Sequence, residues 1–311
     1  MAIIKYRKLF YIFSGLVVAA SATFLFIFGL KPGIDFTGGT IMEVEFTNAL
    51  ADTGQIKNNL AALGFPEARL QPSSEKGLII RLRSISEDEH RLILKTLAGD
   101  AAVPGEALQE KRFDSIGPTI GLELKRKAFI AVGMVLFLIL IFVTWSFRNV
   151  SVSAGFGGAG AQKVSGWKYA LAAVLALIHD VIVPVGLFSL LGRFGGVETD
   201  SLFITACLTI LGFSVHDTIV VFDRIRENLR KSGWDADFET IVGRSLNETY
   251  GRSLATSFAI FLVLGFLFWF GGDSTRFFAL TLLVGLVAGT YSSICLASPF
   301  LVSWSVRPAK K

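Results

Sequence analysis

The stretch from Ser201 to Lys231 reads SLFITACLTILGFSVHDTIVVFDRIRENLRK. Its first part, residues 201–222, is apolar and long enough to cross a bilayer, which takes about 20 such residues. His216 and Asp217 lie inside this run, and a densely charged tail follows it. A carboxylate at the centre of a membrane helix costs roughly 2.5–3.5 kcal/mol, so an intramembrane Asp usually faces a packed or hydrated interior and marks an ion or proton path. Asp217 is therefore the first candidate functional residue.

Long apolar blocks recur through the rest of the chain. Of its 311 residues, 52% are hydrophobic and 18% are charged. Six segments are long and apolar enough to span a membrane: 9–30, 128–147, 169–192, 201–222, 253–272 and 277–306. Two of them contain one Asp each, Asp180 and Asp217, and a His directly precedes each Asp. These blocks predict an α-helical multi-pass membrane protein with six transmembrane helices.

Basic residues at the ends of these blocks predict the orientation of the chain. Three of the first eight residues are basic, and further basic residues follow the second, fourth and sixth spans. By the positive-inside rule, both termini are cytoplasmic and segment 31–127 is extracytoplasmic. Residues 1–30 then form the N-terminal cytoplasmic end with the first span, and 307–311 form a basic cytoplasmic tail. Because orientation accounts for the net charge of +5, we expect no nucleic-acid partner.

Segment 31–127 has the pattern of a small α+β domain. It opens with a turn-rich connector that contains Gly33, Asp35, Gly38 and Gly39. Apolar periodicity then predicts strand, helix, strand, strand, helix and strand, over residues 40–46, 52–63, 67–71, 77–83, 86–97 and 107–116. This is the element order of a ferredoxin-like domain, so we expect one between the first and second spans. Nothing in it suggests an enzyme, which favours a binding or mechanical role.

The membrane part, residues 128–306, contains three further features. The stretch 148–168 includes AGFGGAGA, which is too rich in glycine to fold alone and predicts a flexible cytoplasmic loop. Small and polar residues recur along the fourth span and predict a face that packs on helices rather than lipid: Thr205, Thr209, Gly212, Ser214 and Asp217. In the sixth span, we interpret Gly285, Gly289, Ser292 and Ser293 as packing residues.

Two ionisable residues of the membrane part permit alternative interpretations. Pro184 follows Asp180 by four residues and cannot donate to the carbonyl of residue 180. Asp180 then lies either in a hydrated interior or in a kinked helix, where Ser or Thr hydroxyls bind a buried carboxylate. Arg252, at the start of the fifth span, either snorkels to the headgroups or reaches inward to a carboxylate.

Histidine and carboxylate residues raise the question of a metal site. His179, Asp180, His216 and Asp217 would form a workable ligand set. Each Asp has a simpler role in a proton path, so we predict neither a metal nor another cofactor. His90 lies on a charged helix, and we expect it to be solvated.

Several motifs together resemble a known family. They are GIDFTGG at 33–39, Gly117-Pro118, His179-Asp180, DTIVVFDRIREN at 217–228, and Arg252. These are similar to the SecD/SecF family of bacterial protein-export membrane proteins, within the resistance-nodulation-division superfamily, and the likeness to its smaller subunit covers almost the whole chain. The resemblance implies an accessory subunit of the Sec protein translocase that couples proton flow to motion of the extracytoplasmic domain.

The resemblance also implies which residues act. In the family, an Asp of the fourth span and an Arg at the start of the fifth belong to the proton pathway, and here these positions are Asp217 and Arg252. His216 stands where the family commonly has Asn, and it titrates nearer physiological pH than an amide. We therefore expect Asp217, Arg252, Asp180 and His216 to form the proton pathway, with Gly33, Asp35, Gly38 and Gly39 as an extracytoplasmic motif.

The implied partners follow from the number of spans. Exporters of the superfamily have twelve spans in two similar halves, whereas the six spans here contain no internal repeat. The resemblance thus implies a heterodimer with a SecD-like subunit in the bacterial inner membrane. It also implies that the SecYEG channel and, as a further candidate, YajC are partners. The complex would act on a translocating preprotein and carry protons. The alternative is a proton-coupled exporter of small molecules or lipids, for which segment 31–127 is small.

Overall fold

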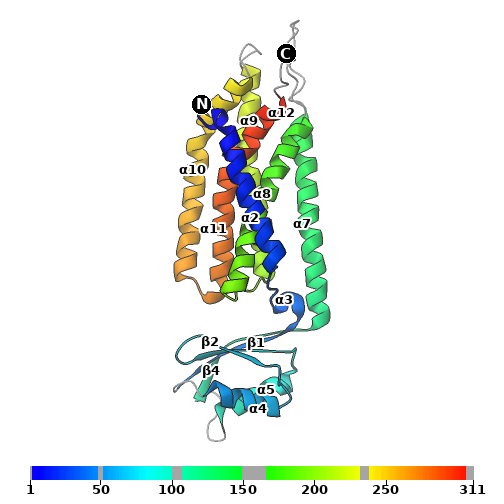
Figure 1. Ribbon diagram of the computed structural model, residues 1–311, viewed down its shortest axis with the longest axis vertical. Coiled ribbons are helices and arrows are strands. Elements are labelled where there is room, and N and C mark those ends of the chain that lie inside the picture. Colours follow the sequence, from blue (N-terminus) through cyan, green and yellow to red (C-terminus); the bar gives the residue numbers. More distant parts are fainter. Residues whose placement is uncertain (1, 48–51, 100–106, 149–165, 232–237, 306–311) are drawn as a thin grey trace. The chain divides into compact units, whose positions relative to one another are not determined.

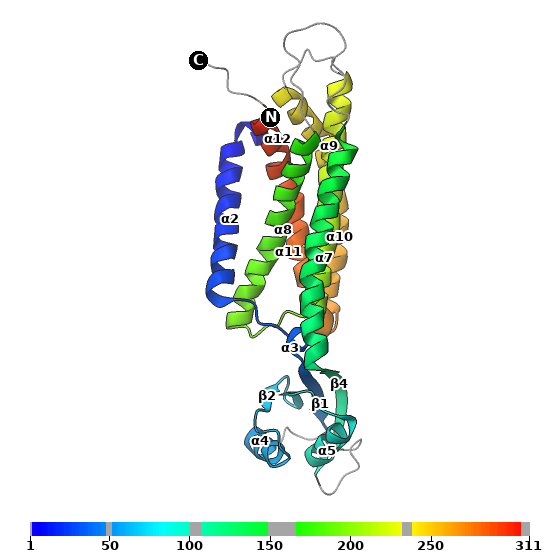
Figure 2. The same cartoon turned by 90° about the vertical axis from the view of Figure 1, so that its right-hand side faces the viewer.

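The apolar blocks of the sequence form long helices in the computed structural model, which describes residues 2–47, 52–99, 107–148, 166–231 and 238–305 (Figures 1 and 2). The chain divides into two units, Met1–Lys31 with Ile130–Lys311, and Pro32–Phe129. Each unit has a buried apolar core of its own. We call them the membrane unit and the sheet unit.

Six helices of the described residues are long and apolar enough to cross a membrane, which confirms the predicted fold class. The six spans are α2 (Arg7–Phe28), α7 (Pro118–Ser146), α8 (Gly166–Phe194), α9 (Ser201–Lys231), α10 (Phe238–Phe270) and a last span made of α11 (Asp273–Ser292), η2 (Ser293–Ala297) and α12 (Ser298–Ser305). The short helix α1 (Ala2–Lys5) precedes the first span. The last span is continuous, and η2 is a π-helical turn within it. Helix α11 packs against α8, α9 and α10, and α8 packs against α2. This last span is also the most buried of the six, so it is the inner span of the bundle.

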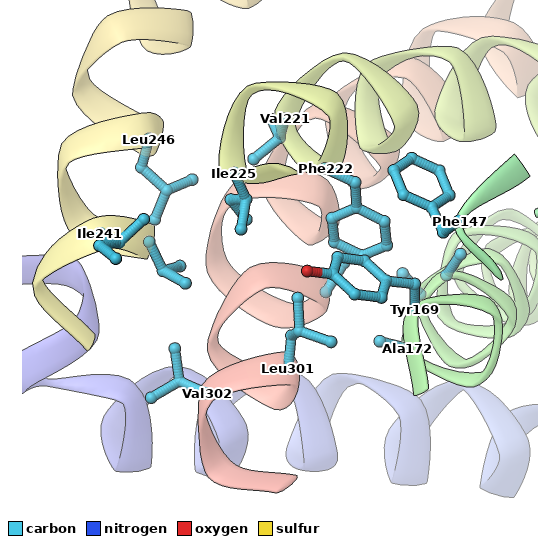
Figure 3. Close-up of a cluster of buried hydrophobic side chains, with 14 of the residues drawn as sticks. Phe147, Tyr169, Ala172, Val221, Phe222, Ile225, Ile241, Leu246, Leu301 and Val302 are labelled. Atoms are coloured by element: carbon cyan, nitrogen blue, oxygen red, sulfur yellow. The ribbon is translucent and has the colours of Figure 1, made fainter. Parts of the chain in front are cut away.

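Aromatic side chains fill the core of the membrane unit near the chain termini (Figure 3). The rings of Phe147 and Tyr169 stack with centroids 5.1 Å apart, and Phe222 meets Tyr169 edge-on at 5.1 Å. The guanidinium of Arg226 lies 5.5 Å from the centre of the Phe147 ring. Aromatic contacts of this kind add about 0.5–1.5 kcal/mol each beyond area burial, so the cluster fastens the end of α7 to α8 and α9.

The sheet unit has the predicted ferredoxin-like topology. It contains α3 (Ile34–Thr37), β1 (Gly39–Phe46), α4 (Thr53–Ala62), β2 (Arg69–Pro72), β3 (Gly77–Leu82), α5 (Glu87–Ala98) and β4 (Leu108–Ile116). The strands follow the order β2-β3-β1-β4, and all neighbours are antiparallel. Helices α4 and α5 cover one face of the sheet (Figure 1). Ser86 and Glu89 form the expected capping box at the start of α5, because each side chain bonds a backbone amide of the other.

The prediction that His90 is solvated is wrong. Its side chain is buried between α5 and β4, where Nε2 lies 2.8 Å from the Glu110 Oε1 atom. The imidazole also stacks on Phe113 at 3.9 Å. The acidic neighbours of His90 in the sequence suggested solvent, but its partners come from a strand 20 residues later.

Some boundaries also differ from those expected. Helix α7 begins at Pro118 and includes the basic approach to the second span, since proline is well suited to the first position of a helix. Helix α10 begins at Phe238, ahead of its apolar part. The glycine-rich part of the expected loop 148–168 and the tail 307–311 lie outside the described residues.

Candidate functional site

A belt of polar side chains crosses the apolar interior of the membrane unit. Its members come from α2, α8, α9, α10, α11 and η2, and each interacts with another member: Ser14, His179, Asp180, Ser214, Asp217, Thr218, Ser257, Thr290, Tyr291, Ser292 and Ser293. We call this set the polar belt. Hydrocarbon offers polar groups no hydrogen bonds, so such groups bond one another between helices.

Asp180 is the fully buried carboxylate of the polar belt. Its Oδ2 atom accepts hydrogen bonds from Ser292 at 2.7 Å and from Ser214. Its Oδ1 atom lies 2.9 Å from Nδ1 of His179. Side chains of three helices therefore surround Asp180, and this geometry matches the interpretation in which hydroxyls bind a buried carboxylate.

Close contact between α9 and α11 makes this arrangement possible. A Cβ atom added to Gly289 would lie 3.1 Å from the Ser214 Cβ atom, and one added to Gly285 would lie 2.1 Å from Ile210. Small residues let membrane helices approach closely, as the sequence predicted for these two glycines. The approach brings Ser214 and Ser292 to the same oxygen of Asp180.

Asp217 lies at the rim of the polar belt and is only half-buried. Its carboxylate interacts with the hydroxyl of Ser257 on α10, which is 2.7 Å from the Thr290 hydroxyl on α11. The next residue, Thr218, is buried and bonds Ser293 at 2.9 Å. Asp217 is thus linked to the bundle through α10 and α11 while part of its side chain faces outward.

Arg252 and His216 are exposed on the membrane unit. Arg252 lines a hollow of about 500 Å³ together with Asp223, Glu227 and Glu248, whereas Asp217 does not line it. Within the described ranges, no ion pair joins Arg252 to Asp217. The structure therefore does not bring these two predicted residues together, and their pairing stays a prediction.

The charged half of the DTIVVFDRIREN motif joins two helices. Arg224 of α9 pairs with Glu248 of α10 at 2.6 Å and with Glu227 of its own helix at 2.6 Å. Asn228 donates to Glu248 at 2.8 Å and to Ser245 at 3.0 Å. This part of the motif therefore fixes the position of α10 against α9.

The glycine motif of the sheet unit surrounds the start of α7. Gly33 precedes the single turn of α3, and Asp35 lies in that turn. Gly38 has a φ of +73°, and a Cβ atom there would lie 2.7 Å from the Cα atom of Pro118. Gly39 also has a positive φ, of +129°. The two glycine-containing motifs of the sequence, 33–39 and 117–118, therefore meet in space.

Sequence reasoning missed several members of the polar belt. The sequence predicts no role for Ser257, Thr290 and Tyr291, and it predicts packing alone for Ser292. The available signal was the run of hydroxyl side chains at 290–293 within an apolar span. A π-helical turn begins at Ser293, the last residue of this run, and such turns are frequent at functional sites. As for metals, no three His, Cys, Asp or Glu side chains of the described residues come together as ligands.

Family models match most of the chain. Residues 100–156 and 165–307 match the family described as "Protein export membrane protein SecD/SecF, C-terminal", and residues 23–49 match the "SecD/SecF GG Motif". This chain belongs to the SecD/SecF family. In this SecD/SecF protein the second match contains the glycine motif 33–39, and the first contains Asp180, Asp217 and Arg252.

Relatives named SecF and SecDF support this family assignment. The chain is 39% identical to "Protein translocase subunit SecF" of Thermobaculum terrenum, over 97% of this chain and 93% of the relative. It is 36% identical to the SecF protein of Sebaldella termitidis, over 100% and 94%. The "Protein translocase subunit SecDF" of Brucella abortus is 33% identical, but this chain spans only 38% of that longer protein.

A solved structure shows the same relation between a shorter and a longer chain. The crystal structure of SecDF, a translocon-associated membrane protein from Thermus thermophilus, superposes with a TM-score of 0.77 at 32% identity. The match covers 98% of this SecD/SecF chain and 38% of that chain. The six-span fold with its sheet unit is therefore shared with part of a SecDF protein.

Proposed function

We propose that this chain is a non-catalytic accessory subunit of the bacterial Sec protein translocase. In this role it couples proton flow through the membrane unit to motion of the extracytoplasmic sheet unit, and so promotes protein export. The SecF and SecDF relatives support the export role. The observation that carries the proton step is the half-buried Asp217, linked by hydroxyls to the polar belt.

The buried and half-buried carboxylates have different roles in this proposal. Asp217 carries the proton, because one side of it remains accessible from outside the bundle. Asp180 holds α8, α9 and α11 together through its hydroxyl partners. Arg252 and His216 complete the pathway from the exposed surface. One charge crossing about 100 mV releases about 2.3 kcal/mol, which is enough to bias a two-state motion.

A SecD-like subunit covers the exposed side of α9. Thr205, Gly212 and His216 are exposed there, and a Cβ atom on Gly212 would meet nothing within 4 Å. Small and polar residues of this kind suit a helix–helix contact better than lipid. The fused SecDF relatives supply the expected partner in one chain. The complex acts with SecYEG and YajC on a preprotein in the inner membrane, with both termini of this chain cytoplasmic.

Isosteric substitution of Asp217 tests the proposal. In cells that carry Asp217→Asn, export of secreted proteins should slow while the abundance of the subunit stays unchanged. Proton flux into proteoliposomes that contain the purified complex should fall as well. Asp88→Asn, an exposed carboxylate of α5 that does not line the hollow around Arg252, is the matched control and should leave both rates near normal. Normal export and normal flux in the Asp217→Asn variant would contradict the proposal.

A further inference from the structure

A cluster of charged side chains lies between α5 and β4 of the sheet unit and is not part of the polar belt. His90 of α5 is 8% exposed. Its Nε2 atom lies 2.8 Å from the Glu110 Oε1 atom on β4. Its Nδ1 atom lies 3.5 Å from the Oε2 atom of Glu87, three residues earlier on α5. A buried imidazole therefore stands between two carboxylates of different elements.

Glu110 lies on the covered face of the sheet, among apolar residues. It pairs with Val44 of β1, which is fully buried, and directly opposite residues of neighbouring strands point to the same face. A carboxylate on this face loses part of its hydration, and His90 supplies a hydrogen bond to it. The imidazole stacks on the Phe113 ring, with centroids 3.9 Å apart and planes 16° apart, which keeps each ring nitrogen directed at its carboxylate.

The number of partners that His90 has depends on its protonation. An ionised carboxylate only accepts hydrogen bonds, so Nε2 donates to Glu110. A neutral imidazole has a single N–H, and its Nδ1 atom is then a buried acceptor without a donor among the described residues. Glu87, the carboxylate beside Nδ1, cannot donate either when ionised. Protonation places a proton on Nδ1, which Glu87 can accept, so the charged ring has two partners and the neutral ring has one.

The surroundings make His90 the candidate for titration near neutral pH. Among side chains, only imidazole and cysteine-type thiols ordinarily change charge close to this range, and residues 32–129 contain one histidine and no cysteine. Arg91 bonds Glu87 at 3.2 Å, whereas Asp88 and Lys95 of α5 are exposed. Three further ion pairs of α5 and β4 side chains do not involve His90: Glu89–Arg83, Lys111–Glu45 and Arg112–Asp114. Helix α4 and strand β1 contribute buried but uncharged residues: Ile56, Leu60, Thr40, Met42, Val44 and Phe46.

We propose that His90 is a proton-operated latch between α5 and β4. When protonated, the imidazolium binds Glu87 and Glu110 together and fastens the first turn of α5 to the strand. When neutral, it binds Glu110 alone and releases that turn. Protonation of buried histidines switches interfaces in other pH sensors in the same way.

The position of the latch in the chain connects it to the second span. Strand β4 ends at Ile116, and α7 begins at Pro118, so the latch acts on the strand that leads into this span. For the side of the membrane on which it acts, the inference rests on the proposed function. There, it gives the extracytoplasmic unit its own response to the local proton concentration. The latch itself needs only the contacts of His90.

Hydrogen exchange of the purified full chain at about pH 5.5 and about pH 7.5 tests the latch. The readout is the protection of the α5 amides from His90 onward, corrected for the intrinsic exchange rate at each pH. We expect protection about fivefold higher at the lower pH, because the second charge-assisted bond is present there. His90→Gln keeps a donor for Glu110 but cannot titrate, so the difference between the two pH values should disappear.

A second variant keeps the test decisive if His90→Gln does not fold. Glu87→Gln removes an exposed charge and offers the neutral ring a donor, so it should reduce the pH effect to less than about twofold. Asp88→Asn, exposed in the same turn of α5, is the matched control and should keep the full effect.

Equal protection at the two pH values in the unsubstituted protein would overturn the proposal, and so would a full pH effect in His90→Gln or Glu87→Gln. In those cases the buried charges only shield β4, an edge strand of the sheet, from pairing with other chains. The measurement uses no proton gradient and no export assay, so its failure is distinguishable from failure of the proposed function.

Discussion

Replacing Asp180 by Asn separates a structural role of this carboxylate from a role in carrying protons. In the native protein, Ser214 and Ser292 both donate to the same Asp180 oxygen. A hydrogen bond to a charged group contributes about 1.5–3 kcal/mol, and a neutral one about 0.5–1.5 kcal/mol. Each of the two bonds should therefore weaken by about 1–1.5 kcal/mol, which together lowers the free energy of unfolding by about 2–3 kcal/mol.

The assay is thermal unfolding of the purified full chain in detergent, followed by circular dichroism. For a unit of about 200 residues, each 1 kcal/mol shifts the melting temperature by about 2–4 °C, so we expect a fall of about 4–12 °C. Asp217→Asn is the matched control and should melt close to the unsubstituted protein, because its carboxylate is only half-buried. An unchanged melting temperature for Asp180→Asn, combined with lost export, would refute this reasoning and assign proton transfer to Asp180.

Two further predictions concern the sheet unit. Gly38→Ala should destabilise this unit by more than Gly99→Ala. The φ angles of the two glycines are +73° and +78°, so an alanine at either position carries about 1–2 kcal/mol of backbone strain. Only at Gly38 would the added Cβ atom also meet backbone, at 2.7 Å. Hydrogen exchange of the strand amides in the full chain measures both, and equal effects would rule out the close contact as the cause. Hydrogen bonds from the Arg83 side chain and from a backbone amide hold the pKa of Glu89 below its ordinary value of 4.5. The ionised Glu89 side chain thus stabilises α5 above about pH 4.5, and this stabilisation is lost as the pH falls through the lowered pKa. Glu89→Gln should abolish the acid sensitivity of amide exchange in α5. If the sensitivity persists in this variant, another group causes it.

Features that depend on chain-local patterns were predictable from the sequence. The six spans follow from the length of the apolar blocks, because the thickness of the bilayer fixes how many residues a helix needs. The ferredoxin-like order follows from the alternation of apolar residues in segment 31–127. The capping box at Ser86 was also evident, since it requires only residues three positions apart.

Features that depend on contacts between distant elements were not predictable. Residues 90 and 110 are far apart in the sequence, and only the packing of α5 on β4 buries His90 against Glu110. Helix α10 begins well before its apolar part, and in this polar part Glu248 binds Arg224 and Asn228 of α9. Neither contact leaves a periodic signal in a single sequence.

The two intramembrane carboxylates show where the sequence stops being informative. By itself, the sequence determined that Asp180 and Asp217 lie within apolar spans, each after a His, and that both are costly enough there to require partners. Only the tertiary structure decided that Asp180 is enclosed by Ser214 and Ser292 while Asp217 stays at the rim beside Ser257. The reason is physical: the rotation of each helix about its axis, set by close contacts such as that of Gly289 with Ser214, decides which side chains face one another.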